Sequence, residues 1–232
     1  MASIAADVRP SGSVSLKLIQ GAPMGEIDSW ASAKLYGKPQ RGLPAHVNAW
    51  RRRNWRRLRF QVLGVLWTQK LRKFLHAPVI AMTSSTFARV LTPDGSIDSY
   101  GLASMKVVTD AGVAYIVDAF QNITEVENFK YHGFGTGGTA EAVGNTALVT
   151  ELTTEYAVNS TRPTGSQTEA SAAVYRTVGT LTPDAAVAIT EHGIFSADTA
   201  GTLLDRSLFS VLNIASGNSL EITYDLTFTS GG

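Results

Sequence analysis

The clearest pattern in the sequence is an alternation of apolar and polar residues near its C-terminal end. In Ser219–Phe228 every second residue is apolar, which is the period of a strand with one buried face. The run Arg206–Ala215 is also rich in strand-forming residues, and Ser216-Gly217-Asn218 between the two runs is typical of a turn. We therefore predict that the two runs form an antiparallel hairpin.

Further short elements are expected upstream of this hairpin. A helix is predicted at Asn145–Tyr156, where Leu148, Leu152 and Tyr156 share one face, and a loop rich in Ser, Thr and Gly is predicted at Asn159–Ala172. The predicted strands are Met105–Thr109 paired with Val113–Phe120 as a hairpin, Phe129–Phe134, Ala173–Thr182 and Val187–Ser196. Seven or eight short strands with one short helix favour a mainly β fold, an antiparallel β-sandwich or jelly roll.

The first third of the chain has a different pattern. Glycine and proline interrupt every run up to Ala45, so irregular backbone is expected there. From His46 to His76 only Gly64 disturbs a helical pattern with two stripes on opposite sides, and such a helix usually needs partners on both. One stripe contains Val47, Trp50, Asn54, Leu58, Val62 and Val65, and the other contains Phe60, Leu63, Trp67, Leu71 and Phe74.

Charge divides the chain into two pieces. Residues 1–81 carry fourteen Lys and Arg against three Asp and Glu, whereas residues 82–232 carry six against sixteen. We therefore predict a basic, partly helical N-terminal extension (1–81), a linker (82–101) with a turn at Pro93-Asp94-Gly95, and a β-sandwich domain (102–232). Two interpretations of the extension stay open, a functional arm or an unselected segment upstream of a start at Met82, and mapping of native N-termini would separate them.

Composition narrows the chemistry further. The chain has no cysteine, which excludes disulfides, thiolate metal sites and a cysteine nucleophile. Its start lacks the order of a secretory signal, and its longest apolar run is far below the roughly 20 residues of a membrane span. We expect a soluble protein that is not exported by a cleaved signal.

The strongest candidate contact site is the run Trp50–Phe60, in which arginines alternate with Trp50 and Trp55. Such a run binds phosphates and stacks on bases, so nucleic acid is a possible partner through this segment alone; an acidic protein surface or an anionic membrane surface offers similar contacts, although no membrane partner is expected. The candidate anion or partner contacts are Arg51, Arg52, Arg53, Arg56, Arg57 and Arg59.

Two other patterns are weaker. Gly133, Gly135 and Gly138 match the dinucleotide motif G-x-G-x-x-G, but the antiparallel pattern that follows does not provide the parallel unit which that motif requires, so simple loop glycines are favoured. His132 and His192 lie in predicted strands and could meet across a sheet, and without a third ligand hydrogen-bonded structural histidines are favoured over a metal site. No catalytic residue, metal site or cofactor is predicted.

Four stretches together resemble a known family. They are Leu102–Asn122, Lys130–Tyr156, Tyr175–Ser196 and Thr202–Phe228, and they resemble small virion structural proteins of tailed bacteriophages, above all the cement or capsid decoration proteins on the outside of the shell. The resemblance covers about residues 102–232 and does not extend to residues 1–81. It implies a rigid β-scaffold without an active site, located on the capsid surface of the virion and in the host cytoplasm during assembly. The implied partners are the major capsid protein and other copies of the same chain.

Two other functions remain as alternatives. One is a tail or head fibre component whose loops bind a host surface glycan. The other is a dinucleotide-dependent activity through residues 133–138, for which a thermal-shift scan with nucleotides is the test, since a ligand that binds only the folded state must stabilise it.

Overall fold

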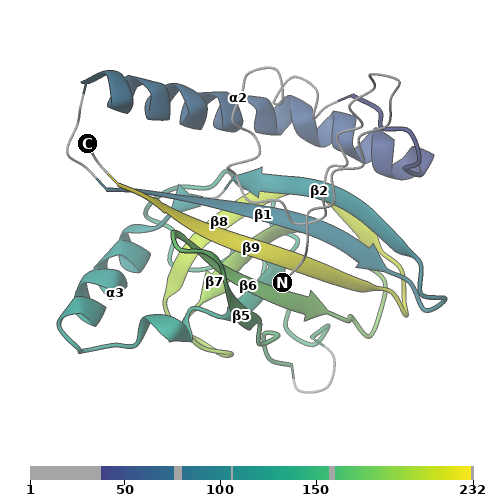
Figure 1. Cartoon of the computed structure of the whole chain (residues 1–232). Helices are drawn as coiled ribbons and strands as arrows, with labels where there is room; N and C mark the ends of the chain where they lie inside the picture. The colour runs from purple at the N-terminus through teal and green to yellow at the C-terminus, as the bar shows by residue number, and fades with distance from the viewer. Residues whose placement is uncertain (1–37, 76–79, 106, 157–159, 231–232) are drawn as a thin grey trace.

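The structure is a computed structural model, which describes residues 38–75, 80–105, 107–156 and 160–230. Its strands form two antiparallel sheets packed face to face, so the predicted mainly β, sandwich-like fold is confirmed (Figure 1). One sheet has the order β2-β1-β9-β6-β5 and the other the order β3-β8-β7-β4. The strands are β1 (Ala81–Leu91), β2 (Ile97–Met105), β3 (Val107–Val108), β4 (Tyr131–Gly135), β5 (Ser166–Ser171), β6 (Val174–Leu181), β7 (Val187–Phe195), β8 (Leu203–Ile214) and β9 (Ser219–Thr229).

The predicted C-terminal hairpin is wrong, although both of its strands exist. β8 pairs with β7 and β3, whereas β9 pairs with β1 and β6, so the turn between them carries the chain from one sheet to the other. Gly217 in that turn has a φ of 85°, a conformation that glycine adopts without strain. The alternation predicted for β9 is confirmed by the buried residues Leu220, Ile222, Tyr224 and Leu226.

The predicted linker at residues 82–101 is also wrong, because these residues form β1 and most of β2. β1 pairs along its whole length with β9, from Ala81 opposite Thr229 to Leu91 opposite Ser219. Ser84, Ser85 and Thr86 are buried in this strand, and their polar character resembles that of a linker. The turn at Pro93-Asp94-Gly95 is confirmed, and Gly95 has a φ of 84°.

Two local predictions of secondary structure are wrong: a predicted strand is a helix, and a predicted helix is not formed. The hairpin partner predicted at Val113–Phe120 is instead the helix α3 (Asp110–Phe120), which Thr109 caps by accepting a hydrogen bond of 2.9 Å from the backbone NH of Gly112. The helix predicted at Asn145–Tyr156 is absent from the described residues; that segment crosses the outside of the second sheet and makes isolated bridges at Glu151 and Tyr156. A short 3₁₀ helix, η2 (Val126–Asn128), follows α3.

The predicted basic helix is confirmed as α2 (Ala45–Leu75), and it lies against the sandwich rather than apart from it (Figure 1). Asn54 is fully buried and joins the two sheets: its Nδ2 donates to the carbonyl of Ala103 in β2 at 2.7 Å, and its Oδ1 accepts from the backbone NH of Ser210 in β8 at 2.9 Å. Val47 and Trp50 belong to the same core cluster as the strands. This part of the extension therefore completes the core, while residues 1–37 lie outside the described residues.

Candidate functional site

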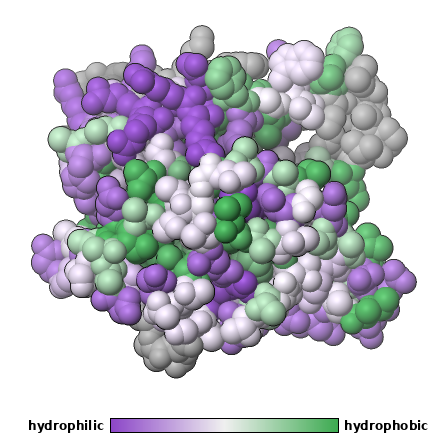
Figure 2. Space-filling view, turned by 180° about the vertical axis from the view of Figure 1, so that it is seen from behind, coloured by the Kyte–Doolittle hydropathy of each residue, from purple (hydrophilic) through white to green (hydrophobic). Residues whose placement is uncertain are grey.

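The arginines predicted as contact residues lie on α2, and the structure separates them. Arg51 is buried and donates to Gln40, so it is not available to a partner. Arg52, Arg53, Arg56, Arg57 and Arg59 are exposed and together form a basic surface over the N-terminal half of α2 (Figure 2). The guanidinium of Arg57 lies 3.6 Å from the carboxylate of Glu141, so Arg57 forms an ion pair with the sandwich.

Trp50 does not take the predicted stacking role. Its side chain is 3 % exposed, and its Nε1 donates to the carbonyl of Ser210 at 2.8 Å. Trp55 is only partly buried and packs beside Leu58 and Phe87. Stacking on bases through both tryptophans is therefore excluded by the position of Trp50 in the core.

The predicted meeting of His132 and His192 across the sheet is confirmed, and both imidazoles are hydrogen-bonded in the interior. His132 Nδ1 lies 3.0 Å from His192 Nε2, and His132 Nε2 lies 3.2 Å from the hydroxyl of Thr177, with all three side chains fully buried between the sheets. The described residues contain no group of three His, Asp or Glu side chains able to hold a metal ion.

The polar interior continues past the histidines to Tyr224 and Asp205. Burial raises the pKa of the Tyr224 hydroxyl well above its ordinary value, and the carboxylate of Asp205 raises this pKa further. Ser84 acts in the opposite direction and lowers this pKa. These side chains are closed off from solvent between the two sheets.

The glycine motif has a packing role. Gly133 and Gly135 lie in β4, not in a loop, and β4 pairs antiparallel with β7. A Cβ at Gly135 would lie 2.5 Å from the carbonyl oxygen of Thr150, whereas Gly138 faces open space. The antiparallel pairing contradicts the parallel unit of a dinucleotide fold, so close packing against the crossing segment explains the glycine at 135.

A buried ion pair, which the sequence did not reveal, holds that crossing segment in place. Arg206 and Glu191 are fully buried and lie 2.8 Å apart on neighbouring strands. Glu191 accepts hydrogen bonds from the backbone NH groups of Gly137, Val149 and Thr150, and Arg206 donates to the carbonyls of Thr139 and Ala140 and to the side chain of Asn145. The charges are occupied in fixing a loop and are not directed at a cleft.

The four edge strands of the two sheets are β2, β5, β3 and β4, and those at β2 and β4 are covered within the described residues. α2 covers β2 and the C-terminal half of β8 through Asn54 and Trp50, and β3 pairs with the N-terminal half of β8. β4 is covered by two segments, since the backbone NH of Leu152 donates to Phe134 and the NH of His132 donates to Pro163. The edge strand β3 is only two residues long, whereas the edge strand β5 has six residues, all of which are exposed.

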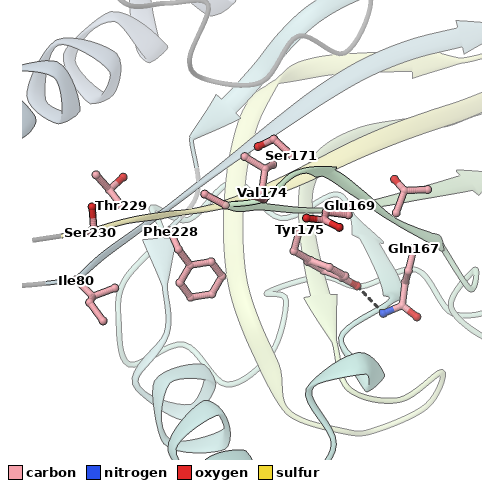
Figure 3. A pocket seen from close by; sticks show the side chains of 12 residues that line it. Ile80, Gln167, Glu169, Ser171, Val174, Tyr175, Phe228, Thr229 and Ser230 are labelled. Atoms are coloured by element: carbon pink, nitrogen blue, oxygen red, sulfur yellow. Dashed lines mark hydrogen bonds between the residues drawn. The ribbon is translucent and has the colours of Figure 1, made fainter. Parts of the chain in front are cut away.

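A groove of about 1100 Å³ lies beside β5 (Figure 3). It is lined by β5, the turn into β6, the first residues of β6, the end of β9, and Ile80 just before β1. Figure 3 shows the rings of Tyr175 and Phe228 on the same side of their strands, and the hydroxyl of Tyr175 accepts from Gln167 Nε2 at 2.8 Å. Glu169 brings a negative charge to the rim of the groove. The groove therefore combines an uncovered strand edge with apolar walls.

An adjoining apolar cleft of about 420 Å³ lies between α3 and the end of the sandwich. Its walls include Ile116, Phe120, Phe129 and Leu226, with Glu127 at its rim. Tyr175 and Phe228 line both the cleft and the groove. This arrangement suits the binding of apolar side chains from a partner more than the chemistry of a reaction, which requires converging ionisable groups.

Comparison of the chain with models of protein families, with curated proteins and with solved structures finds no match. The described helices include none with the length and apolar character needed to span a bilayer.

Proposed function

We propose that this chain is a virion structural protein that binds the outside of a bacteriophage capsid. In this role it stabilises the shell by bridging subunits of the major capsid protein, and it carries out no reaction. The proposal combines the resemblance of residues 102–232 to capsid decoration proteins with a fold whose buried polar groups are used for internal packing.

The observation that carries the proposal is the uncovered edge of β5. A strand edge presents backbone NH and carbonyl groups that readily pair with a strand of another protein, and proteins usually cover such edges. Here the edges at β2 and β4 are covered and the edge strand β3 is only two residues long, whereas no described strand pairs with the outer side of β5, which lies beside the groove lined by Tyr175 and Phe228. A strand of the capsid protein added to β5 would gain backbone hydrogen bonds and place side chains in this groove.

The energetics of a shell suit such a contact. Each copy needs only a modest interface, because many copies act together on a lattice of repeated sites and the avidity exceeds the single affinity. A rigid sandwich can bridge two capsid subunits with little loss of conformational entropy on binding.

The test is co-sedimentation of the purified full chain with shells that lack it. The β5 variant carries Thr168→Lys and Ala170→Lys, because lysine on an edge strand opposes strand addition. The control variant carries Thr180→Lys and Ala186→Lys, which add the same charge at exposed positions outside β5, one near the end of β6 and one in the segment that follows it. We expect the wild-type chain and the control to bind the shells, and the β5 variant to bind at least about tenfold more weakly.

Two results would overturn the proposal. Binding to host cells or their glycans, with no binding to shells, would favour the fibre component instead. Equal binding of shells by the β5 variant and the control would remove the edge strand from the contact.

A further inference from the structure

The outward face of α2 carries an unusual combination of charge and exposed apolar area. α2 contains nine Lys and Arg and no Asp or Glu. Phe60, Trp67 and Phe74 are 67 %, 58 % and 78 % exposed, and Leu71 is also exposed. These four residues recur at spacings that place them on one side of the helix, opposite the side that Asn54 and Leu58 bury against the sandwich.

The segment from Asp110 to Glu127, which contains α3, carries the opposite charge with the same apolar character. It has four acidic residues and no Lys or Arg. Five of its large apolar side chains are exposed, and Phe120 is the most exposed of them at 88 %. They are Val113, Val117, Phe120, Ile123 and Val126. Val113, Val117 and Phe120 form one stripe at four- and three-residue spacing along α3.

These two surfaces hold most of the exposed apolar bulk of the protein. Of the fourteen large apolar side chains that stand out as exposed among the described residues, nine lie on α2 or on Asp110–Glu127. α2 covers β2 and part of β8, whereas α3 lies on a different side of the sandwich, so the two surfaces do not meet within one copy (Figure 1).

We infer that the outward face of α2 docks on the α3 surface of a second copy of this chain. Burial of the two apolar stripes against each other drives the association, and the basic residues of α2 meet the acidic residues of Asp110–Glu127. The apolar cleft beside α3 accepts an aromatic side chain of the docked helix. Because the surfaces differ, the contact is either reciprocal in a dimer or repeated head to tail in a larger assembly.

The composition of the α2 face distinguishes this occupant from nucleic acid. Phosphates would satisfy the arginines, but they would leave Phe60, Trp67, Leu71 and Phe74 exposed, and Trp50 is not available for stacking. A lipid surface would match both features of α2, but it would leave the acid-flanked apolar stripe of α3 unexplained. A second copy buries both surfaces at once.

The experiment is sedimentation analysis of the full chain with variants that disable one surface each. The helix variant carries Arg53→Glu and Trp67→Ser, and the α3 variant carries Asp118→Lys and Phe120→Ser. The matched controls carry Arg41→Glu with Ile97→Ser, and Asp184→Lys with Ile97→Ser, which make the same kinds of change at other positions outside both surfaces. Circular dichroism and the melting temperature verify that each variant folds.

We expect the wild-type chain and both controls to associate, and each single-surface variant to associate at least about tenfold more weakly. A mixture of the helix variant and the α3 variant restores a one-to-one complex, because each retains the surface that the other lacks. Association of the wild-type chain weakens when salt is raised, since salt screens the charged contacts.

Several outcomes would overturn the inference. These are a wild-type chain that stays monomeric at high concentration, variants that associate as tightly as their controls, or a mixture that fails to form the complex. Monomeric wild-type chain that binds vesicles of anionic lipid or duplex DNA through α2 would assign the helix to that partner instead. Shell components are absent throughout, so failure here is distinguishable from failure of shell binding through β5.

Discussion

Replacement of Asn54 by leucine tests whether α2 is an integral part of the sandwich. The leucine side chain is branched at Cγ like that of asparagine, but it is larger and neither donates nor accepts a hydrogen bond. The change therefore leaves the backbone NH of Ser210 and the carbonyl of Ala103 without the partner that Asn54 supplies at 2.9 and 2.7 Å. Asn54 is fully buried, so water does not readily replace the lost amide.

The magnitude follows from the two backbone groups. A buried polar group left without a partner costs about 1–3 kcal/mol, so the two together cost about 2–6 kcal/mol. A domain is typically stable by only about 5–15 kcal/mol, and the loss is therefore a large fraction of the total. With a urea dependence of about 2 kcal/mol per molar, the unfolding midpoint is expected to fall by about 1–3 M.

Urea unfolding followed by tryptophan fluorescence is the assay, because Trp50 lies in the core beside Asn54. Gln69→Leu is the matched control: Gln69 is half-buried on the same helix and lies several turns beyond the two sheet edges that Asn54 joins. A loss of less than about 0.5 kcal/mol for Asn54→Leu, or one equal to that of the control, would refute the packing of α2 on the sheets. It would also favour the interpretation of the extension as an unselected segment.

Three further predictions concern the interior. Gly135→Ala is expected to destabilise the protein by about 1–3 kcal/mol in urea unfolding because its Cβ meets the Thr150 carbonyl, whereas Gly138→Ala, in open space, is expected to be neutral. Arg206→Met is expected to cost about 3–5 kcal/mol in the same assay, since it leaves Glu191 buried without its cation. The raised pKa keeps the proton on Tyr224 in the folded chain, while the unfolded chain releases it above about pH 10, so the free energy of unfolding of the wild-type chain falls as the pH rises above 10. Tyr224→Phe removes this group, and the free energy of unfolding of the variant is expected to fall less steeply between pH 10 and 11.5, by up to about 1.4 kcal/mol per pH unit.

The sequence predicted elements where local pattern and burial agree. Apolar and polar residues alternate in β9 because one face of this strand lies in the core. Apolar residues recur at helical spacing in α2 because one side of this helix packs on the sheets. The predictions are wrong where the composition of a segment does not match its burial or its conformation. β1 buries Ser84, Ser85 and Thr86, which resemble a linker, and α3 contains valine, isoleucine and tyrosine, which favour strands, although Thr109 supplies a helix cap.

The candidate surfaces were harder to predict than the fold, because they depend on which strands become edges. No local pattern marks β5 as an edge, and five of its six residues are polar, so that it resembles the loop that the sequence predicts there. The Arg206–Glu191 pair likewise depends on the register between β7 and β8, in which Gly193 lies opposite Arg206. By contrast, the second apolar stripe of α2 was visible from spacing alone, and with it the need for a partner on that side.

The position of α2 explains why basic residues are concentrated in the first part of the chain. The inward side of this helix must be apolar or hydrogen-bonded to cover β2 and β8, so its many basic residues are confined mainly to the outward side. The four exposed aromatic or aliphatic side chains on this outward side lower the solubility of an isolated molecule. The cost is offset when a surface of opposite charge and similar apolar character covers it, and Asp110–Glu127 of another copy is such a surface. Under the proposed association, the two pieces of opposite charge are therefore complementary parts of one assembling protein.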